Sequence, residues 1–329
     1  MTITTGTSPA QIQAAGRQRW TKRRRRSERQ RRSERRRSTG GVSQANRGYL
    51  FVAPFLIFFL GLFLLPLLYA AYLSLFRERL VGGTTFVGLG NYARAFGDDR
   101  LIGGVLRVAR FFLLQVPIML GLALLAALAI DSGLLRLSKV FRLSIFVPYA
   151  VPSAVAALMW GYLYGPDYGP FAQLAHRIGT GVPQFLTASH MLGSLANIVT
   201  WEFTGYDMII LYAALRSIPQ DLYEAAAVDG AGAWRIAWSI KIPALRPALL
   251  LCLLFSVIGS FQLFTEPNLV QRLAPNVIDS AYTPNLYAYS LAFTSQDVNY
   301  AAAVSFLLGL VIVVASYVVL FATSRRARS

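Results

Sequence analysis

Six runs of predominantly apolar residues, each about 20 residues long, constrain this chain more than any other feature. As an α-helix, about 20 residues at 1.5 Å each cross the roughly 30 Å hydrocarbon core of a bilayer. The composition agrees, because 55% of the residues are hydrophobic and only 14% are charged, whereas a soluble domain carries about 25% charged residues. We therefore predict an all-α membrane protein with six transmembrane helices.

The predicted spans lie within a single membrane domain, residues 48–324. Their approximate bounds are 50–76, 108–130, 143–164, 193–215, 246–265 and 300–323. Pro148 and Pro152 fall inside the third span and are expected to kink it.

An arginine-rich segment precedes the first span and contains "TKRRRRSERQRRSERRRS". Residues 17–47 hold 14 Arg or Lys and 2 Glu, out of a net charge of +17 for the whole chain. Such a sequence cannot bury enough apolar surface to fold, so residues 1–47 are expected to form a disordered tail. Attraction to anionic lipid and a role as a topology anchor are both favoured over nucleic-acid binding, because aromatic residues do not interleave with the arginines.

The distribution of basic residues predicts the orientation of the spans. If the tail is cytoplasmic, then the loops 131–142 and 216–246 and the C-terminus are also cytoplasmic, and these segments hold 24 of the 32 Lys and Arg. We therefore expect a multi-pass protein of a bacterial cell membrane with both termini in the cytoplasm.

Catalytic and metal sites are not indicated. Cys252 stands alone in an apolar run, and His176 and His190 are separated in a polar loop, so no metal-ligand or nucleophile spacing is present. A G-x-x-x-x-G-K-[ST] phosphate loop is also missing from the sequence. The sequence thus predicts neither a catalytic residue nor a bound cofactor on this chain.

A polar segment, "EAAAVDGAG" at Glu224–Gly232, interrupts the apolar sequence between the fourth and fifth spans. The stretch "SIPQ", residues 217–220, is a capping-box pattern that predicts the start of a short helix. Gly230 and Gly232 are expected to end that helix, and "AWRIAWSI" to begin a second, amphipathic one that Pro243 and Pro247 break.

This segment has two interpretations. The small alanines and the carboxylates of Glu224 and Asp229 form a compact knob that a groove on a partner could hold. An ordinary amphipathic loop packing on its own bundle has about equal weight on composition alone.

The longer stretch "EAAAVDGAGAWRIAWSIKIPALRP" closely resembles the EAA motif of binding-protein-dependent ATP-binding cassette (ABC) importer permeases. The residues that match the motif are Glu224, Ala225, Ala226, Asp229, Gly230, Ala231, Pro243 and Pro247. The resemblance implies the permease fold of type I ABC importers, in which the loop 217–242 is a coupling helix that docks on a cassette ATPase.

Other stretches resemble the carbohydrate branch of that family, the maltose-type sugar permeases. They are "FVGLGNYARAF", "VPYAVPSAVAALMWGYLY", "WEFTGYDMIILYAALRSIP" and "FQLFTEPNLV", and the resemblance covers about residues 49–323. After the fifth span, "QRLAPNVIDSAYTPN" replaces the usual glycine-rich stretch, so the particular sugar is left open.

Candidate substrate contacts come from polar residues inside the spans, where charges are costly and usually functional. Asp207 lies about 15 Å above Ser217, near the midplane, and Glu202 and Gln262 reach similar heights of about 22 and 24 Å. A sugar site also needs aromatic faces, and the candidates are Trp160, Trp201, Phe261 and Phe264. The alternative is that the two carboxylates only hold the bundle together and that the aromatic residues form an interfacial belt.

We expect the chain to be the permease subunit of an ATP-driven, binding-protein-dependent importer for a sugar or oligosaccharide. The implied partners are two cassette ATPase subunits that bind ATP and Mg²⁺, a second permease, an external solute-binding protein, the sugar and membrane lipid. The second permease is expected to be a different chain, although the residues do not separate a heterodimer from a homodimer. The alternative is an ion-coupled secondary transporter that uses Glu202 and Asp207.

Overall fold

The computed structural model describes residues 51–79, 82–133 and 135–326 of the chain. The predicted tail, residues 1–47, lies outside this range. The chain divides into two units at Tyr69 and Ala70, and each is described by itself. In the first unit the described residues form a helix that exposes large apolar side chains such as Phe55 and Phe58, with a π-helical turn at Phe59–Leu64. This surface suits contact with lipid.

The described residues contain four helices that are long and apolar enough to cross a membrane. They are Phe51–Ser74, which ends with α3 (Leu65–Ser74), then α5 (Asp99–Asp131), Arg246–Val270 and Val298–Phe321 within α16 (Val298–Arg326). A bent pair of helices, described below, brings the number to five. The all-α membrane fold is thus confirmed, whereas the count of six spans remains a prediction.

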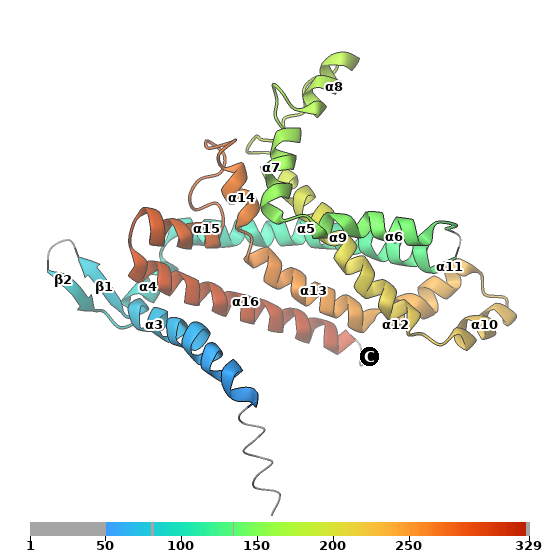
Figure 1. Cartoon of the computed structure of the whole chain (residues 1–329), viewed down its shortest axis with the longest axis horizontal. Helices are drawn as coiled ribbons and strands as arrows, with labels where there is room; N and C mark the ends of the chain where they lie inside the picture. The colour runs from blue at the N-terminus through green and yellow to red at the C-terminus, as the bar shows by residue number, and fades with distance from the viewer. Residues whose placement is uncertain (1–50, 80–81, 134, 327–329) are drawn as a thin grey trace, which may run out of the picture. The chain divides into compact units, whose positions relative to one another are not determined.

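Helix α9 (Met191–Arg216) covers the fourth predicted span, although its acidic and amide side chains lower its hydropathy. It packs along α5 through buried apolar residues that include Ala123, Ala127, Met208 and Leu211. Because α9 is enclosed by its neighbours, it can hold polar residues that a lipid-facing helix could not. Figure 1 shows α9 lying among α5, α6 and α13 (Arg246–Phe261).

Helix α5 begins at Asp99, well before the predicted start near residue 108. The reason is a side-chain cap: the Asp98 carboxylate accepts hydrogen bonds from the backbone N–H groups of Arg100 at 3.0 Å and Leu101 at 3.4 Å. The charged first turns at this end carry too few apolar residues for a pattern based on hydropathy to include them. We call this end of the bundle the capped end.

The third predicted span is bent far more sharply than a proline kink alone would require. Helix α6 (Ser138–Phe146), a 3₁₀ turn (Val147–Ala150) and α7 (Ser153–Leu163) together turn through 97°. Pro148 lies in the turn, and Pro152 occupies the N-cap of α7. From this bend α7 leads away from the bundle to α8 (Pro170–Ile178), as Figure 1 shows.

The capped end is joined by polar contacts. Strands β1 (Phe76–Arg79) and β2 (Gly83–Phe86) form an antiparallel hairpin that precedes α4 (Gly90–Phe96). The Asp98 carboxylate also accepts hydrogen bonds, each 2.7 Å long, from the hydroxyls of Tyr287 in α15 (Pro284–Tyr289) and Tyr300 in α16. One side chain therefore connects the starts of α5, α15 and α16.

Candidate functional site

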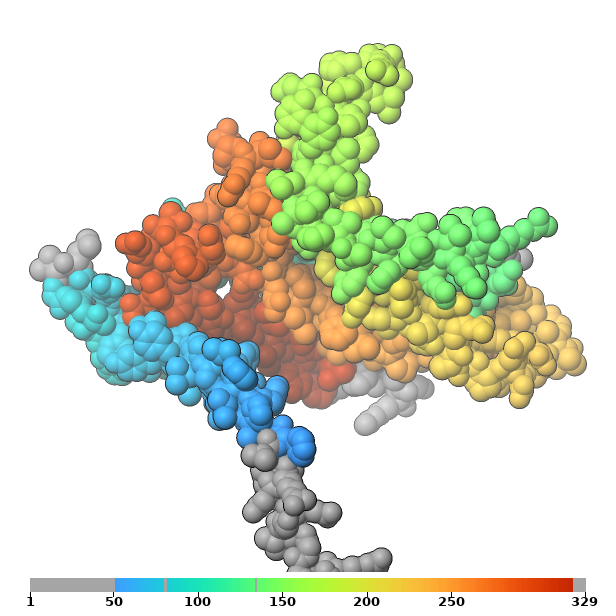
Figure 2. Space-filling view, viewed as in Figure 1, coloured from blue at the N-terminus to red at the C-terminus, as the bar shows by residue number. Residues whose placement is uncertain are grey.

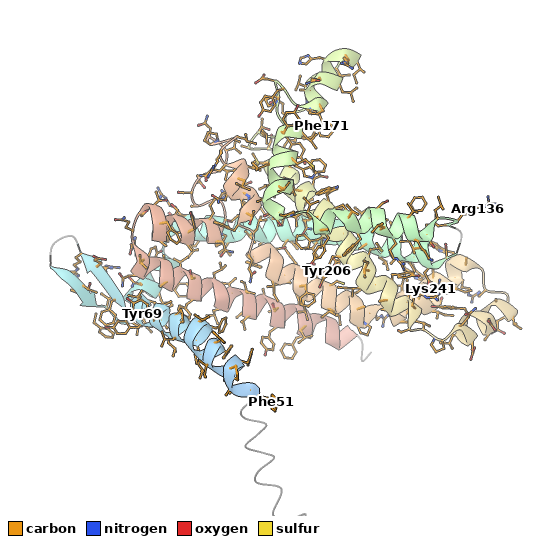
Figure 3. All side chains as sticks on the ribbon, in the orientation of Figure 1. Phe51, Tyr69, Arg136, Phe171, Tyr206 and Lys241 are labelled. Atoms are coloured by element: carbon orange, nitrogen blue, oxygen red, sulfur yellow. The ribbon has the colours of Figure 1, made fainter. Side chains whose placement is uncertain are left out.

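A cavity of 370 Å³ opens in the middle of the bundle, between α5, α9, the 3₁₀ turn and the far end of α13. Tyr206 marks its position in Figure 3. The lining residues are mainly aromatic, amide, hydroxyl and acidic: Gln115, Met119, Tyr149, Val199, Phe203, Tyr206, Asp207, Phe255, Ser256, Gly259, Ser260, Gln262, Leu263, Phe264, Thr265 and Glu266. Neither Lys nor Arg is among them.

One wall of the cavity is aromatic. The rings of Tyr149 and Tyr206 stack with their centroids 4.8 Å apart and their planes inclined by 23°. The ring of Phe203 meets Tyr149 edge-on at 5.8 Å. The bent third span supplies Tyr149, and α9 supplies the other two residues, so this wall depends on the contact between α6 and α9.

That contact is made by backbone. A Cβ added to Gly205 would lie only 2.0 Å from the carbonyl oxygen of Ile145 at the end of α6. Only glycine leaves room for such an approach. Gly205 thus brings the turn that carries Tyr149 against the α9 residue that carries Tyr206.

The cavity also has an acidic lining residue, Asp207, which is only 3% exposed. Its Oδ2 has no hydrogen-bond partner, and the Cys252 thiol lies beside the carboxylate. A buried acceptor without a partner costs about 1–3 kcal/mol, so such a group calls for an explanation. Gln262 and Glu266 also line the cavity and add further polar groups.

The predicted substrate residues are distributed unevenly. Asp207, Gln262 and Phe264 lie on the cavity. Glu202, predicted to lie at a height similar to that of Gln262, is buried near Glu266 and is not among the lining residues.

The other predicted aromatic residues lie elsewhere. Phe261 packs in a hydrophobic cluster with Val108 and Leu308. Trp160 and Trp201 meet edge-to-face, with ring centroids 5.9 Å apart. Trp160 lines a separate groove of 460 Å³ that is also lined by Phe171 of α8. The contact roles of all these residues remain predictions.

Sequence reasoning missed the stacked tyrosines and Glu266. Tyr149 sits in "VPYAVP", where the flanking prolines signal a turn, and Tyr206 directly precedes Asp207. A turn inside an apolar span together with an aromatic residue beside a buried acid was the available signal. Glu266 lies past the break that ends α13, where no depth count from the helix start applies.

The segment between α9 and α13 begins with α10 (Gln220–Val228). Seven of its nine residues, Glu224 among them, are exposed, and only Tyr223 and Ala226 are half-buried. Gly230 has a φ of +78°, and the Ala231 N–H donates to the Ala226 carbonyl at 2.9 Å, so Gly230 ends the helix as predicted. Gly232, also expected to end it, instead has a φ of −68° and is the N-cap residue of the next helix.

The predicted capping box is wrong. Pro219 is the N-cap residue of α10 and makes no side-chain cap. The Ser217 hydroxyl instead donates to the Ala214 carbonyl at 2.7 Å, at the end of α9. The turn of α9 into Pro219 leaves Ser217 facing back along its own helix.

A second limb returns to the bundle through α11 (Ala233–Ile236), a π-helical turn (Ala237–Lys241) and α12 (Ile242–Ala244). Figure 1 shows α10 and α11 beyond the same end of the bundle, and Figure 2 shows this part of the chain forming an outer edge. We call this the loop end. The exposed rings of Trp234 and Trp238 stack here at 6.2 Å.

The comparisons with known proteins agree with this architecture. The family "Binding-protein-dependent transport system inner membrane component" matches residues 119–328, which is more than half of the chain. The chain therefore belongs to this family. It is a permease subunit of a binding-protein-dependent importer, a multi-pass membrane component of transport and not an enzyme, which confirms the resemblance read from the EAA segment.

Several relatives are similar over most of their length. The lactose transport system permease protein LacF of Rhizobium radiobacter is 33% identical, over 85% of this chain and 94% of that protein. The arabinooligosaccharides transport system permease protein AraP of Bacillus subtilis (strain 168) is 27% identical, over 84% and 88%. The sn-glycerol-3-phosphate transport system permease protein UgpA of Brucella abortus is 32% identical, over 65% and 73%.

A solved structure has the same fold. It is a bacterial alginate ABC transporter in complex with an alginate pentasaccharide-bound periplasmic protein. One of its chains matches this one with a TM-score of 0.77 and 19% identity, over 88% of this chain and 97% of that one.

Proposed function

We propose that this chain forms one half of the translocation path of an ATP-driven importer for an uncharged sugar or oligosaccharide. The observation that carries the proposal is the pairing of two features in one bundle. A cavity with an aromatic wall and a carboxylate oxygen that has no hydrogen-bond partner lies at its middle, and an exposed helix bearing EAA residues lies at its loop end.

The exposed helix α10 would dock on a cassette ATPase. Ala225 and Ala227 are exposed, so a partner surface can approach the helix backbone closely, and Glu224 offers a carboxylate at the edge of that surface. An ordinary amphipathic loop would bury an apolar face on its own bundle, yet α10 contains no buried residue. The exposure therefore supports the docking interpretation over the alternative that composition left open.

The test of docking is Glu224→Ala in the purified complex. Losing one partner of a desolvated charge pair costs about 2–5 kcal/mol, so the variant should release the ATPase or lose sugar-stimulated ATP hydrolysis. Asp221→Ala is the matched control, because Asp221 is an exposed acid on the same helix outside the motif. Wild-type assembly and ATPase stimulation in Glu224→Ala would refute this role.

The cavity supports a sugar as the substrate. The apolar faces of a sugar ring pack on aromatic rings, which the stacked Tyr149 and Tyr206 provide. Sugar hydroxyls are donors, and the unpartnered Oδ2 of Asp207 is an acceptor without a donor. A bound hydroxyl would thus remove the cost of leaving this carboxylate oxygen unpaired.

The charges of the cavity favour an uncharged substrate. Asp207 and Glu266 are both acidic, and no basic residue lies among the lining residues. At an effective dielectric constant of 20, a substrate carboxylate 6 Å from one ionised acid is repelled by about 3 kcal/mol, which is roughly a hundredfold in affinity. The relatives named for lactose and arabinooligosaccharides transport therefore indicate the substrate class better than the one named for sn-glycerol-3-phosphate.

Uptake into proteoliposomes tests the substrate class, with the complete complex and its binding protein. Lactose and digalacturonate are suitable probes because they are similar in size and differ in charge. Uptake is normalised to the sugar held by the binding protein, so that the ratio reports on the membrane path. We expect lactose to exceed digalacturonate by roughly a hundredfold. A preference for digalacturonate would refute the substrate class and leave the docking role intact.

The remaining parts of the assembly follow from the family. We infer that the loop end faces the cytoplasm, that two ATPase subunits supply ATP and Mg²⁺ binding, and that a second permease completes the cavity as a heterodimer. An external binding protein would deliver the sugar at the other end, and ATPase closure would tilt the helices to alternate access. The ion-coupled alternative finds no support in the family or its named relatives.

A further inference from the structure

An ion pair at the loop end is unusually well enclosed. The Lys241 Nζ donates to the Asp131 Oδ2 at 2.5 Å, and the two side chains are only 13% and 5% exposed. Asp131 is the last residue of α5, whereas Lys241 ends the π-helical turn of the second limb. The pair thus joins a long helix of the bundle to the segment that follows α10, near the position of Lys241 in Figure 3.

A third residue extends this contact to α10. The Lys241 Nζ lies 5.0 Å from the ring centroid of Tyr223, and the Tyr223 hydroxyl is buried without a hydrogen-bond partner. Burial and the nearby Asp131 carboxylate both raise the pKa of Tyr223, against the opposing effect of Arg216. We call Asp131, Lys241 and Tyr223 the loop-end link.

The loop-end link attaches α10 to the bundle through Tyr223. Of the residues in α10, only Tyr223 and Ala226 are half-buried, and the others are exposed. A helix without a buried apolar face cannot transmit a push through hydrophobic packing. The contact between Tyr223 and Lys241 is therefore a side-chain route by which a displacement of α10 can reach the bundle.

Helix α5 then continues from the link to the cavity. Gln115 and Met119 on α5 line the cavity, and Asp131 lies 16 residues beyond Gln115, about 24 Å along the helix axis. Between these points α5 packs against α9 through Ala123 and Ala127. Movement of the end of α5 would therefore move residues of the cavity wall.

Stability alone does not explain the pair. Two charges in a buried pair lose hydration, and replacing such a pair by apolar residues is often neutral or stabilising. A long-range ion pair in an enclosed site is thus better explained by a requirement for a fixed connection between two elements. The exposed pair at the capped end, Arg94 with Asp297 at 2.9 Å, differs because its side chains are 43% and 31% exposed.

We propose that the loop-end link is the mechanical connection that carries motion of α10 into α5 and the cavity, so that Asp131, Lys241 and Tyr223 act as positioning residues for energy coupling. The inference rests on the proposed docking of α10 on an ATPase. It assigns the transmission to three side chains that lie outside both the docking surface and the cavity lining.

The test is the double variant Asp131→Asn with Lys241→Met in the complete complex. Both charges are removed together, so neither is left buried and unpaired, and the complex should assemble and hydrolyse ATP. The number of sugar molecules moved per ATP should fall by about tenfold, within the range found for coupling between distant sites. The control removes the exposed pair, Arg94→Met with Asp297→Asn, and should keep the wild-type ratio.

A covalent replacement distinguishes transmission from a structural role. The chain has one native cysteine, Cys252, which is buried, so Asp131→Cys with Lys241→Cys can be bridged selectively by a bifunctional thiol reagent. Bridging should restore the sugar-to-ATP ratio that the unbridged variant has lost.

The outcomes are separable. A wild-type ratio in the uncharged double variant, or no recovery on bridging, overturns the link. Wild-type assembly and ATPase stimulation in Glu224→Ala overturn the docking proposal instead.

Discussion

The capped end of the bundle offers the sharpest quantitative prediction, because one carboxylate makes four hydrogen bonds there. Asp98 accepts from the Tyr287 and Tyr300 hydroxyls at 2.7 Å each and from two backbone N–H groups of α5. We predict that Asp98→Ala destabilises the protein more than any other single substitution at this end that leaves the apolar core unchanged.

The magnitude follows from the contacts. A hydrogen bond to a charged group contributes about 1.5–3 kcal/mol, and because Asp98 is half-exposed we take about 1.5 for each tyrosine. Loss of the N-cap adds about 1 kcal/mol, which gives about 4 kcal/mol in total. At roughly 2 °C per kcal/mol for a chain of this size, Tm should fall by about 8 °C.

The assay is thermal unfolding of the detergent-purified chain, followed by fluorescence-detected size exclusion. Tyr287→Phe and Tyr300→Phe each remove one hydrogen bond and should lower Tm by about 3 °C. Asp99→Ala, an exposed acid in the next position, is the control and should shift Tm by less than about 1 °C. If the Tm of Asp98→Ala equalled that of the wild type, or was no lower than that of Asp99→Ala, the predicted contribution of these hydrogen bonds to stability would be wrong.

Three further predictions concern pH, packing and transport. Burial raises the pKa of Asp98, but its four hydrogen bonds together hold that pKa below the ordinary 3.8. The ionised carboxylate should therefore stabilise the fold above about pH 4, and this stabilisation should be lost as the pH falls through the pKa of Asp98 in the folded protein. The difference in Tm between the wild type and Asp98→Asn should then disappear. Gly205→Ala should lower Tm by several degrees, because its Cβ meets backbone, whereas Gly193→Ala on the same helix has open space and should not. Tyr206→Ala should raise the KM for lactose uptake by up to about tenfold while Tyr206→Phe leaves it near wild type, since the ring face makes the contact.

The local features of this fold were predictable where a residue's own neighbours determine the outcome. Runs of apolar residues identified α5, α13 and α16, because lipid contact demands apolar side chains whatever their partners are. Gly230 identified the end of α10, because few other residues accept its positive φ. The EAA spacing identified the exposed segment for the same reason, because small residues and turns depend on neighbouring positions in the chain and not on distant partners.

Features that depend on distant partners were not predictable. Pro148 and Pro152 indicated a kink, but the 97° bend requires a place for α6 to pack, and Gly205 supplies that place on another helix. Depth counting predicts only how far along α9 Asp207 and Glu202 lie, and it could not determine which face of the helix Glu202 occupies. The Asp131–Lys241 pair joins residues far apart in sequence, and no local sequence pattern around either residue predicts that they form an ion pair.

The glycine contact between α6 and α9 has a consequence for how this cavity can evolve. Where two backbones touch, no side chain is available to lengthen, shorten or rotate, so the distance between the elements cannot be adjusted by small substitutions. The tyrosine pair that this contact supports is therefore a fixed surface of constant width. Adaptation to longer or differently branched sugars would have to take place on the facing wall, at residues such as Phe255, Ser256 and Gln262 on α13 and just beyond it.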